Sequence, residues 1–277
     1  MPFIEARDGT SLFYKDWGSG PPAVFVSSWA LPSDMWQYQM TAMVDAGVRC
    51  IAPDTRGLGR SDQPGTRYDY DTLAADLAAL LDHLDLRDVT LIGHSMGGGV
   101  VVRYLARYGS ERVGRVALLA PTTPFLLKTA DNPDGIDRVA VEYVRAAFSK
   151  DFPKWLDDNA APFFSPETSP QMIDWVAGLM RGTSLKVAID LNRISTESDF
   201  RAELPEIRVP VLIIHGDADV SAPINLTGRR TAELIPGSTF TMYEGAPHGL
   251  MFTHTDRLNS DLLAFVTSGV LAAAVAG

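Results

Sequence analysis

The sequence predicts an α/β fold, in which a mostly parallel central sheet is covered by helices on both faces. Short apolar runs typical of buried strands alternate with amphipathic helical segments through most of the chain. Runs such as DVTLIG at 88–93 are almost continuously apolar, as expected for strands that are buried on both faces. The alternation stops between about residues 122 and 204, where only helical pieces occur. We therefore expect a sheet core that carries one inserted helical region.

The composition is that of an ordinary globular protein and limits its partners. The chain has 277 residues, of which 46% are hydrophobic and 21% are charged, so it is long enough to bury a full core. Its formal net charge of −10 would repel nucleic acid and anionic membrane surfaces, and we expect neither as a partner. The single cysteine, Cys50, lies in the apolar run VRCIAP and is interpreted as a core residue that holds no metal.

The two ends of the chain predict a cytoplasmic protein without a membrane span. The first ten residues lack the basic start and the apolar stretch of a secretory signal. The longest apolar run, VLAAAVAG at 270–277, is too short to cross a bilayer.

The first part of the chain predicts a hairpin followed by alternating strands and helices. FIEAR and SLFYKDW flank a DG turn, which is typical of a hairpin. AVFVSS predicts a strand, and DMWQYQMTAMVDAG predicts a helix that Asp34 caps and Gly47 ends. VRCIAPD is the next strand, and DYDTLAADLAALLDHLDL is an amphipathic helix with leucines at three- and four-residue spacing. DVTLIG, GGGVVVRYLARYG and RVGRVALLAP then predict strand, helix and strand, with Gly109 ending the helix.

The second part of the chain predicts a helical cap and the return of the sheet. We expect a core made of residues 1–121 and 205–277, and a cap made of residues 122–204. The cap contains several large apolar side chains, most of them expected to pack and a minority to line an apolar pocket. They are Phe125, Phe148, Phe152, Trp155, Phe163, Phe164, Met172, Trp175 and Met180. After the cap, VPVLIIHGDAD and STFTMYEGA predict strands, while PINLTGRRTAELI and DRLNSDLLAFV predict helices.

The stretch GHSMG at 93–97 fits the nucleophile-elbow pattern. In this pattern Ser95 adopts a strained backbone conformation, and its hydroxyl projects above the sheet. Side chains at 93 and 97 would collide where the strand and the helix approach each other, which explains Gly93 and Gly97. The alternative is a tight corner of small residues without chemistry. A base and an acid elsewhere in the chain decide between the two interpretations, because a serine hydroxyl needs both to become a nucleophile.

One of the five histidines is suitably placed to act as the base. His248, in EGAPHGL, follows the last predicted strand on a loop with Pro and Gly. His215 lies inside a strand, and His94 adjoins the serine but points elsewhere, so we interpret both as structural. His83 lies on an amphipathic helix, and His254 in the closing segment is the weaker candidate.

The acid is expected in HGDADVSAP, at the end of the preceding strand. Asp219 is the candidate, Asp217 is its competitor, and Pro223 is expected to start the next helix. The resulting chain order of serine, acid and histidine, Ser95, Asp219 and His248, is the order found in α/β-hydrolases.

The chain resembles an α/β-hydrolase over nearly its whole length. GHSMGG, DTRGLGRSDQP, HGDADVSAP and EGAPHGL occur in the order typical of that family. YDYDTLAADL, PFLLKTADNPDG and EGAPHGLMFTH are similar to the bacterial cofactor-free haloperoxidase and aryl esterase branch. The resemblance implies the α/β-hydrolase fold, a serine esterase acting on small-molecule esters, and a side perhydrolase activity that needs no haem or metal cofactor.

The resemblance also implies an oxyanion hole made by the backbone N–H groups of Met96 and Trp29. Here the sequence departs from the family, because Ser27 and Ser28 stand where a His-Gly pair usually precedes the oxyanion-hole residue. Ala30 stands where perhydrolase-like relatives tend to have proline. Ester hydrolysis is therefore a safer expectation than peracid formation.

The glycines and arginines of DTRGLGRSD do not predict a phosphate site. The segment lacks the G-K-[ST] ending of a phosphate loop and the G-x-G-x-x-G spacing of a dinucleotide-binding turn. We interpret it as a structural turn that follows the strand RCIAP.

Several other functions remain open from the sequence. A lactonase, an amidase or a carbon–carbon bond hydrolase would use the same three residues, and a non-catalytic ligand receptor could share the scaffold. Ser95 argues against haloalkane dehalogenases and epoxide hydrolases, which attack with a carboxylate. The sequence leaves the oligomeric state open, including a homo-oligomer.

Overall fold

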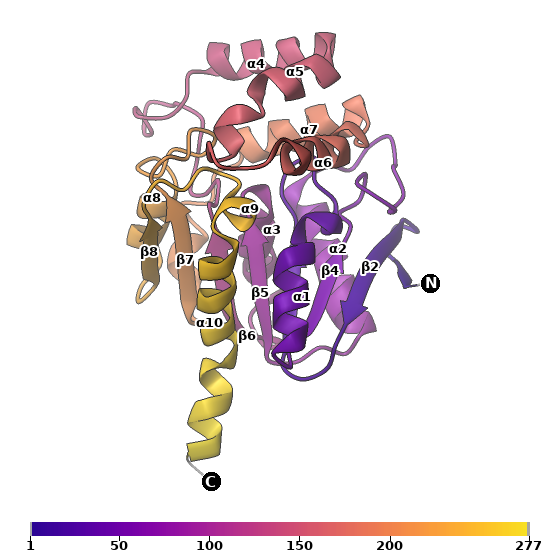
Figure 1. Ribbon diagram of the computed structural model, residues 1–277, viewed down its shortest axis with the longest axis vertical. Coiled ribbons are helices and arrows are strands. Elements are labelled where there is room, and N and C mark those ends of the chain that lie inside the picture. Colours follow the sequence, from indigo (N-terminus) through magenta and orange to yellow (C-terminus); the bar gives the residue numbers. More distant parts are fainter. Residues whose placement is uncertain (1, 276–277) are drawn as a thin grey trace.

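Figure 1 shows a twisted sheet between two layers of helices, with further helices above one edge of the sheet. The structure is a computed structural model that describes residues 2–275. Eight strands form one sheet in the order β1-β2-β4-β3-β5-β6-β7-β8. β2 pairs antiparallel with β1 and β4, and the remaining neighbours pair in parallel. The predicted α/β fold with a mostly parallel sheet is confirmed.

The strands lie where the sequence patterns predict them. β1 (Phe3–Glu5) and β2 (Ser11–Trp17) form the predicted hairpin. The other strands are β3 (Pro22–Val26), β4 (Arg49–Pro53), β5 (Val89–His94), β6 (Val113–Leu119), β7 (Val211–Gly216) and β8 (Thr239–Tyr243).

Two separate hydrophobic cores lie on opposite faces of the sheet. α1 (Gln37–Asp45) and α10 (Thr255–Val275) cover one face, and α2 (Tyr70–His83), α3 (Met96–Tyr108) and α8 (Gly228–Leu234) cover the other (Figure 1). In β3, Val24 and Val26 pack into the core under α2 and α3, while Ala23 and Phe25 pack into the core under α1 and α10. Because both faces are buried, the strand sequences show little apolar–polar alternation.

Two predicted helix starts are wrong, although two predicted helix ends are correct. Asp34 caps no α-helix, because it lies in a short 3₁₀ turn, η1 (Ser33–Trp36), and its carboxylate pairs with basic side chains instead. Pro223 does not start α8, which begins at Gly228. Before α8 the Arg229 N–H donates to the Ile224 carbonyl oxygen five residues earlier, and this turn is wider than a turn of an α-helix. Gly47 and Gly109 end α1 and α3 with positive φ, as predicted.

Residues 122–204 add no strand to the central sheet and contain most of the helices above it. These helices are α4 (Arg138–Lys150), α5 (Phe152–Asn159), η2 (Ala161–Phe163), α6 (Pro170–Arg181) and α7 (Leu185–Glu197). Figure 1 shows them above the carboxyl ends of the parallel strands. The chain then returns to the sheet through η3 (Leu204–Glu206), and α9 (Leu250–Thr253) precedes α10.

Within residues 2–275 no helix is both long enough and apolar enough to cross a membrane. The apolar run noted at 270–277 ends in residues 276 and 277, which lie outside the described residues.

Candidate active site

Ser95 lies on a strained turn between β5 and α3. Its backbone has φ 54° and ψ −120°, a combination that residues with a side chain rarely adopt. A Cβ atom added at Gly93 would lie 2.6 Å from the carbonyl oxygen of Gly97, and one added at Gly97 would lie 2.4 Å from that of Val26. The steric explanation for the two glycines is therefore confirmed, and it also accounts for the position of the Ser95 hydroxyl at the end of the sheet.

The three residues selected from the sequence lie in one hydrogen-bonded chain. The Ser95 Oγ and the His248 Nε2 are 2.9 Å apart, and the His248 Nδ1 and the Asp219 Oδ2 are 2.6 Å apart. With Nδ1–H donating to the carboxylate, Nε2 is free to accept from the serine hydroxyl. Each residue follows a different parallel strand, β5, β7 or β8, and these strands end at the same edge of the sheet.

Asp219 is held as a carboxylate in a buried position. Its side chain is fully buried and also accepts hydrogen bonds from the backbone N–H groups of Ser221, at 2.9 Å, and Ala222, at 2.8 Å. Burial on its own would raise the pKa of Asp219, but the neighbouring His248 and the hydrogen bonds from His215 and His248 outweigh it and hold that pKa well below its usual range. Asp219 is therefore ionised at neutral pH.

The competing acid and the strand histidine occupy different places. Asp217 accepts a hydrogen bond from the Gly245 N–H at 2.6 Å and does not contact a histidine. The His215 Nε2 lies 3.1 Å from the Asp219 Oδ2 and 2.8 Å from the Ala222 carbonyl oxygen. Because both partners are acceptors, this nitrogen carries a proton. His215 therefore donates to the Asp219 carboxylate and helps to hold it in position.

His94 supports His248 through its backbone. Its Nε2 donates to the His248 carbonyl oxygen at 3.0 Å, and burial holds the pKa of His94 well below its usual value, so the ring is neutral. His94 and His215 have structural roles, as the sequence predicts, and each contacts a member of the candidate triad. Their contacts span 154 and 4 positions along the chain, and only the shorter one, from His215 to Asp219, could have been suspected from spacing.

Trp29 and Ala30 are hydrogen-bonded to residues of the helical region above the sheet. The Trp29 Nε1–H donates to the Ala188 carbonyl oxygen on α7 at 2.8 Å, and the Thr183 hydroxyl donates to the Ala30 carbonyl oxygen at 3.1 Å. Ala30 has φ 58°, a value that the ring of proline excludes. In the described part of the chain the backbone N–H groups of Trp29 and Met96 have no protein acceptor.

Of the two serines that replace the usual His-Gly pair, one has a local partner. The Ser28 hydroxyl donates to the Trp29 carbonyl oxygen at 3.4 Å and lines the cavity described next. The Ser27 hydroxyl is buried and has no partner among the described residues.

A cavity of about 400 Å³ opens onto Ser95 and His248. Its walls are mainly apolar and come from the loops after the strands and from α4 to α7. Four of the nine large apolar cap residues named from the sequence line it, and the others pack elsewhere. These four are Trp155, Phe163, Phe164 and Met180.

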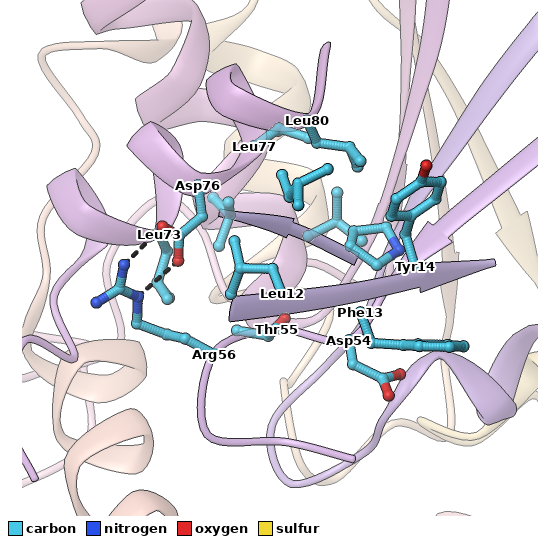
Figure 2. Close-up of a pocket in the computed structure, with 14 residues that line it drawn as sticks. Leu12, Phe13, Tyr14, Asp54, Thr55, Arg56, Leu73, Asp76, Leu77 and Leu80 are labelled. Carbon is cyan, nitrogen blue, oxygen red and sulfur yellow. Dashed lines mark hydrogen bonds and ion pairs between the residues drawn. The ribbon is translucent and has the colours of Figure 1, made fainter. Parts of the chain in front are cut away.

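The DTRGLGRSD segment is structural, as predicted. Asp54 accepts hydrogen bonds from the backbone N–H groups of Ser33 and Arg60, each at 2.8 Å, which joins this turn to the segment after β3. Arg56 pairs with Asp76 on α2 at 2.6 Å and with Asp8 at 2.9 Å, beside a small cavity between the hairpin and α2. Figure 2 shows Arg56 reaching across to Asp76.

The strand order and the strained serine turn define an α/β hydrolase. The family model described as alpha/beta hydrolase fold matches residues 21–255, and the chain belongs to this family. A non-heme chloroperoxidase from Streptomyces lividans is 41% identical over 278 residues, which cover 97% of this chain and 100% of the relative. A bifunctional esterase/perhydrolase from Acinetobacter calcoaceticus is 35% identical, with the same coverage.

A solved structure of an esterase also resembles this chain. An esterase from Exiguobacterium antarcticum matches with a TM-score of 0.93 and 32% sequence identity, covering 96% of this chain and 99% of that chain. The resemblance to the haloperoxidase and esterase branch of the α/β hydrolases is therefore confirmed.

Proposed function

We propose that the protein is a serine hydrolase that cleaves carboxylic esters of small, largely apolar molecules through an acyl-enzyme. The observation that carries the proposal is the hydrogen-bonded chain from Ser95 through His248 to the buried Asp219, at the edge of a mainly apolar cavity. The esterase and esterase/perhydrolase relatives support the same chemistry.

In the first half of the reaction, the His248 Nε2 takes the proton of the Ser95 hydroxyl while the Oγ attacks the ester carbonyl carbon. Asp219 accepts from the Nδ1–H and stabilises the imidazolium that forms. The N–H groups of Met96 and Trp29 receive the negative charge that develops on the carbonyl oxygen. The imidazolium then gives its proton to the departing alkoxide, which leaves as an alcohol.

In the second half, water attacks the acyl-enzyme with His248 again as the base. The carbonyl oxygen once more carries the developing charge, and the bond between the acyl carbon and the Ser95 Oγ breaks. His248 returns the proton to the Oγ, so the carboxylic acid and the free enzyme are the products.

We further propose that residues 122–204 act as a cap over a core of residues 1–121 and 205–277. The contacts of α4 to α7 with the cavity support this division. The Gly249 N–H donates to the Phe163 carbonyl oxygen at 3.0 Å, and the Phe163 ring packs edge-on against His248. A cap with these contacts covers the base and limits the size of the acyl or alcohol group.

Perhydrolysis is proposed as a side activity. Hydrogen peroxide would attack the acyl-enzyme in place of water, and the products would be a peracid and free Ser95. The esterase/perhydrolase relative supports this reaction. Against it, the φ of Ala30 is one that proline, the residue expected there from the resemblance to perhydrolases, cannot adopt. With acetate and peroxide we expect peracid at a lower rate than ester hydrolysis.

The test is hydrolysis of p-nitrophenyl acetate, butyrate and octanoate by the wild type and its variants. Ser95→Ala and His248→Ala should each reduce kcat by about six orders of magnitude, and Asp219→Asn by about four. Asp217→Asn is the matched control for the acid, because Asp217 bonds only to the nearby Gly245 N–H. A folded Ser95→Ala protein with wild-type turnover would refute the proposal.

A wild type that is folded but inert on all three esters would also contradict ester hydrolysis. Lactones and amides would then be tested with the same variants. Tight binding of a small molecule without turnover would favour the receptor alternative.

A further inference from the structure

One helix of the cap presents a polar strip to the mainly apolar cavity. Asn192, Ser195 and Thr196 lie three and four positions apart on α7, so they share one face of the helix. All three line the cavity, together with Thr122 from the loop that follows β6. Polar groups at such positions need partners, because an unsatisfied donor or acceptor in an apolar cavity is costly.

The amide of Asn192 is held in one orientation. The Arg145 Nε on α4 donates to the Asn192 Oδ1 at 3.1 Å. Because arginine only donates, the atom it contacts is the amide oxygen, and the NH₂ group is on the other side. That NH₂ group has no protein acceptor among the described residues, so its two hydrogens are available to a bound molecule.

The charge of Arg145 is balanced outside the cavity. Its second guanidinium nitrogen lies 2.8 Å from the Glu197 carboxylate and 3.2 Å from the Thr196 hydroxyl. Among the described residues that line the cavity there is no Asp, Glu, Lys or Arg side chain. The polar strip is therefore uncharged, and a charged ligand would lose hydration there without gaining a counter-charge.

Two hydroxyl groups complete the strip close to the candidate nucleophile. The Ser195 hydroxyl donates to the Thr122 Oγ1 at 3.5 Å, and the Thr122 N–H donates to the Ser95 carbonyl oxygen at 3.4 Å. Both hydroxyl side chains are buried, and their mutual contact is at the long limit of a hydrogen bond. These long contacts leave room for a ligand oxygen that binds both groups more closely.

The tyrosine behind this pair stays neutral. Burial raises the pKa of Tyr70 well above its usual value, although hydrogen bonds with Ser195 and Thr122 oppose the rise. The Tyr70 hydroxyl also donates to the Met96 carbonyl oxygen at 3.4 Å. The strip thus keeps an uncharged set of donors and acceptors at neutral pH.

We propose that Thr122, Asn192 and Ser195 form a subsite that binds an uncharged oxygen group of the substrate, a hydroxyl or a carbonyl. Esters that carry such a group are then preferred over alkyl esters of the same shape. The inference rests on the proposed function, because it takes the substrate to be an ester opened at Ser95.

The test compares isosteric esters by pH-stat titration. Methyl 3-hydroxybutanoate against methyl 3-methylbutanoate places the hydroxyl on the acyl side, and 2-hydroxyethyl butanoate against propyl butanoate places it on the alcohol side. In one of the two pairs we expect the wild type to favour the hydroxy ester in kcat/KM by roughly tenfold, the ratio that one or two net hydrogen bonds supply. A ratio near one in both pairs, with ester hydrolysis intact, overturns the subsite and leaves the proposed function standing.

Variants separate recognition from a general defect. Asn192→Leu and Thr122→Val keep the shape of the side chain and remove its polar atoms, and Ser195→Ala deletes only the hydroxyl group. In each variant the ratio should fall towards one. Ser149→Ala on α4 is the control, because Ser149 is bonded only to its own helix, outside the cavity, and the ratio should not change. Equal losses on both esters of a pair would indicate a general defect and overturn the assignment.

A binding measurement tests the subsite without turnover. Calorimetry of the same esters with the Ser95→Ala protein should give a several-fold lower Kd for the hydroxy ester of the favoured pair. If no ester is hydrolysed by the wild type, this measurement still decides the subsite, and equal Kd values in both pairs refute it.

Discussion

The substitution Gly97→Ala tests whether close packing at the serine turn holds residues 26–29 in place. These residues, called the oxyanion segment here, end at Trp29, a proposed oxyanion donor. The added Cβ would lie 2.4 Å from the Val26 carbonyl oxygen and 2.7 Å from the Ser27 carbonyl oxygen. An ordinary C···O contact is about 3.3 Å or longer, so the overlap is roughly 0.6 to 0.9 Å against two backbone groups. Overpacking of this kind costs about 1 to 3 kcal/mol, and backbone cannot move aside as a flexible side chain does. We expect the free energy of unfolding to fall by about 3 kcal/mol.

The same shift should reduce catalysis. Val26 and Ser27 lead directly into Trp29, whose N–H is a proposed oxyanion donor, and a lost donor lowers kcat by about 10²- to 10³-fold. Denaturant unfolding measures the stability, and p-nitrophenyl butyrate hydrolysis measures kcat. Gly178→Ala is the control, because Gly178 is exposed on α6 and an added Cβ would meet nothing within 4 Å.

Alanine is favoured over glycine in a helix by about 1 kcal/mol, so Gly178→Ala should be slightly more stable than the wild type. A Gly97→Ala protein with wild-type stability and kcat would refute the argument that the close approach at the turn fixes the oxyanion segment.

Three further perturbations test other parts of the structure. Trp29→Phe keeps an aromatic side chain but removes the five-membered ring of the indole with its Nε1–H donor to Ala188, so kcat should fall about fivefold or more, fivefold being the effect of one hydrogen bond. An unchanged kcat would show that this bond does not position Trp29. The hydrogen bonds from Arg56 hold the pKa of Asp8 well below its value in the unfolded chain. Asp8 therefore stabilises the fold above about pH 4 and loses this effect as the pH falls. Asp8→Asn should be less stable than the wild type at pH 7, and denaturant unfolding should show the difference shrinking below pH 4; a constant difference contradicts the ion pair. Burial raises the pKa of the Cys50 thiol to about 12, so an aromatic disulfide reagent at pH 8 should label no thiol in the native protein and one per chain in urea. Labelling of the native protein would contradict the buried position.

The candidate site could be found in the sequence because its members follow strands. A parallel sheet brings the carboxyl ends of its strands to one edge, so Ser95, Asp219 and His248 meet although 153 positions separate the serine from the histidine. The role of Gly93 and Gly97 could also be predicted, because the close approach of the strand and the helix leaves no room for a Cβ atom at either position. Chain order and local steric rules were sufficient for these positions.

Other features of the site had no local signal. Trp29 meets Ala188 across 159 positions, and Asn192 is oriented by Arg145 from another helix. In the sequence, the polar side chains of α7 are spaced like the solvent-facing residues of an ordinary amphipathic helix. Their direction into the cavity depends on how α4 to α7 pack over the sheet.

The helix starts at Asp34 and Pro223 show the same limit. Each residue type favours a helix N-terminus, but Asp34 is engaged by Lys15 and Arg60, and the chain after Pro223 makes a wider turn. Local preferences of about 1 kcal/mol give way to tertiary contacts of similar or greater strength.

By itself, the sequence determined the sheet, the order of its elements and the three residues that meet at its edge, because strand patterns and turn chemistry are local properties. Tertiary structure alone decided the shape of the cavity, the contact of Trp29 with Ala188 and the polar strip on α7. These depend on side chains that are distant in sequence, and no local pattern records which of them pack together.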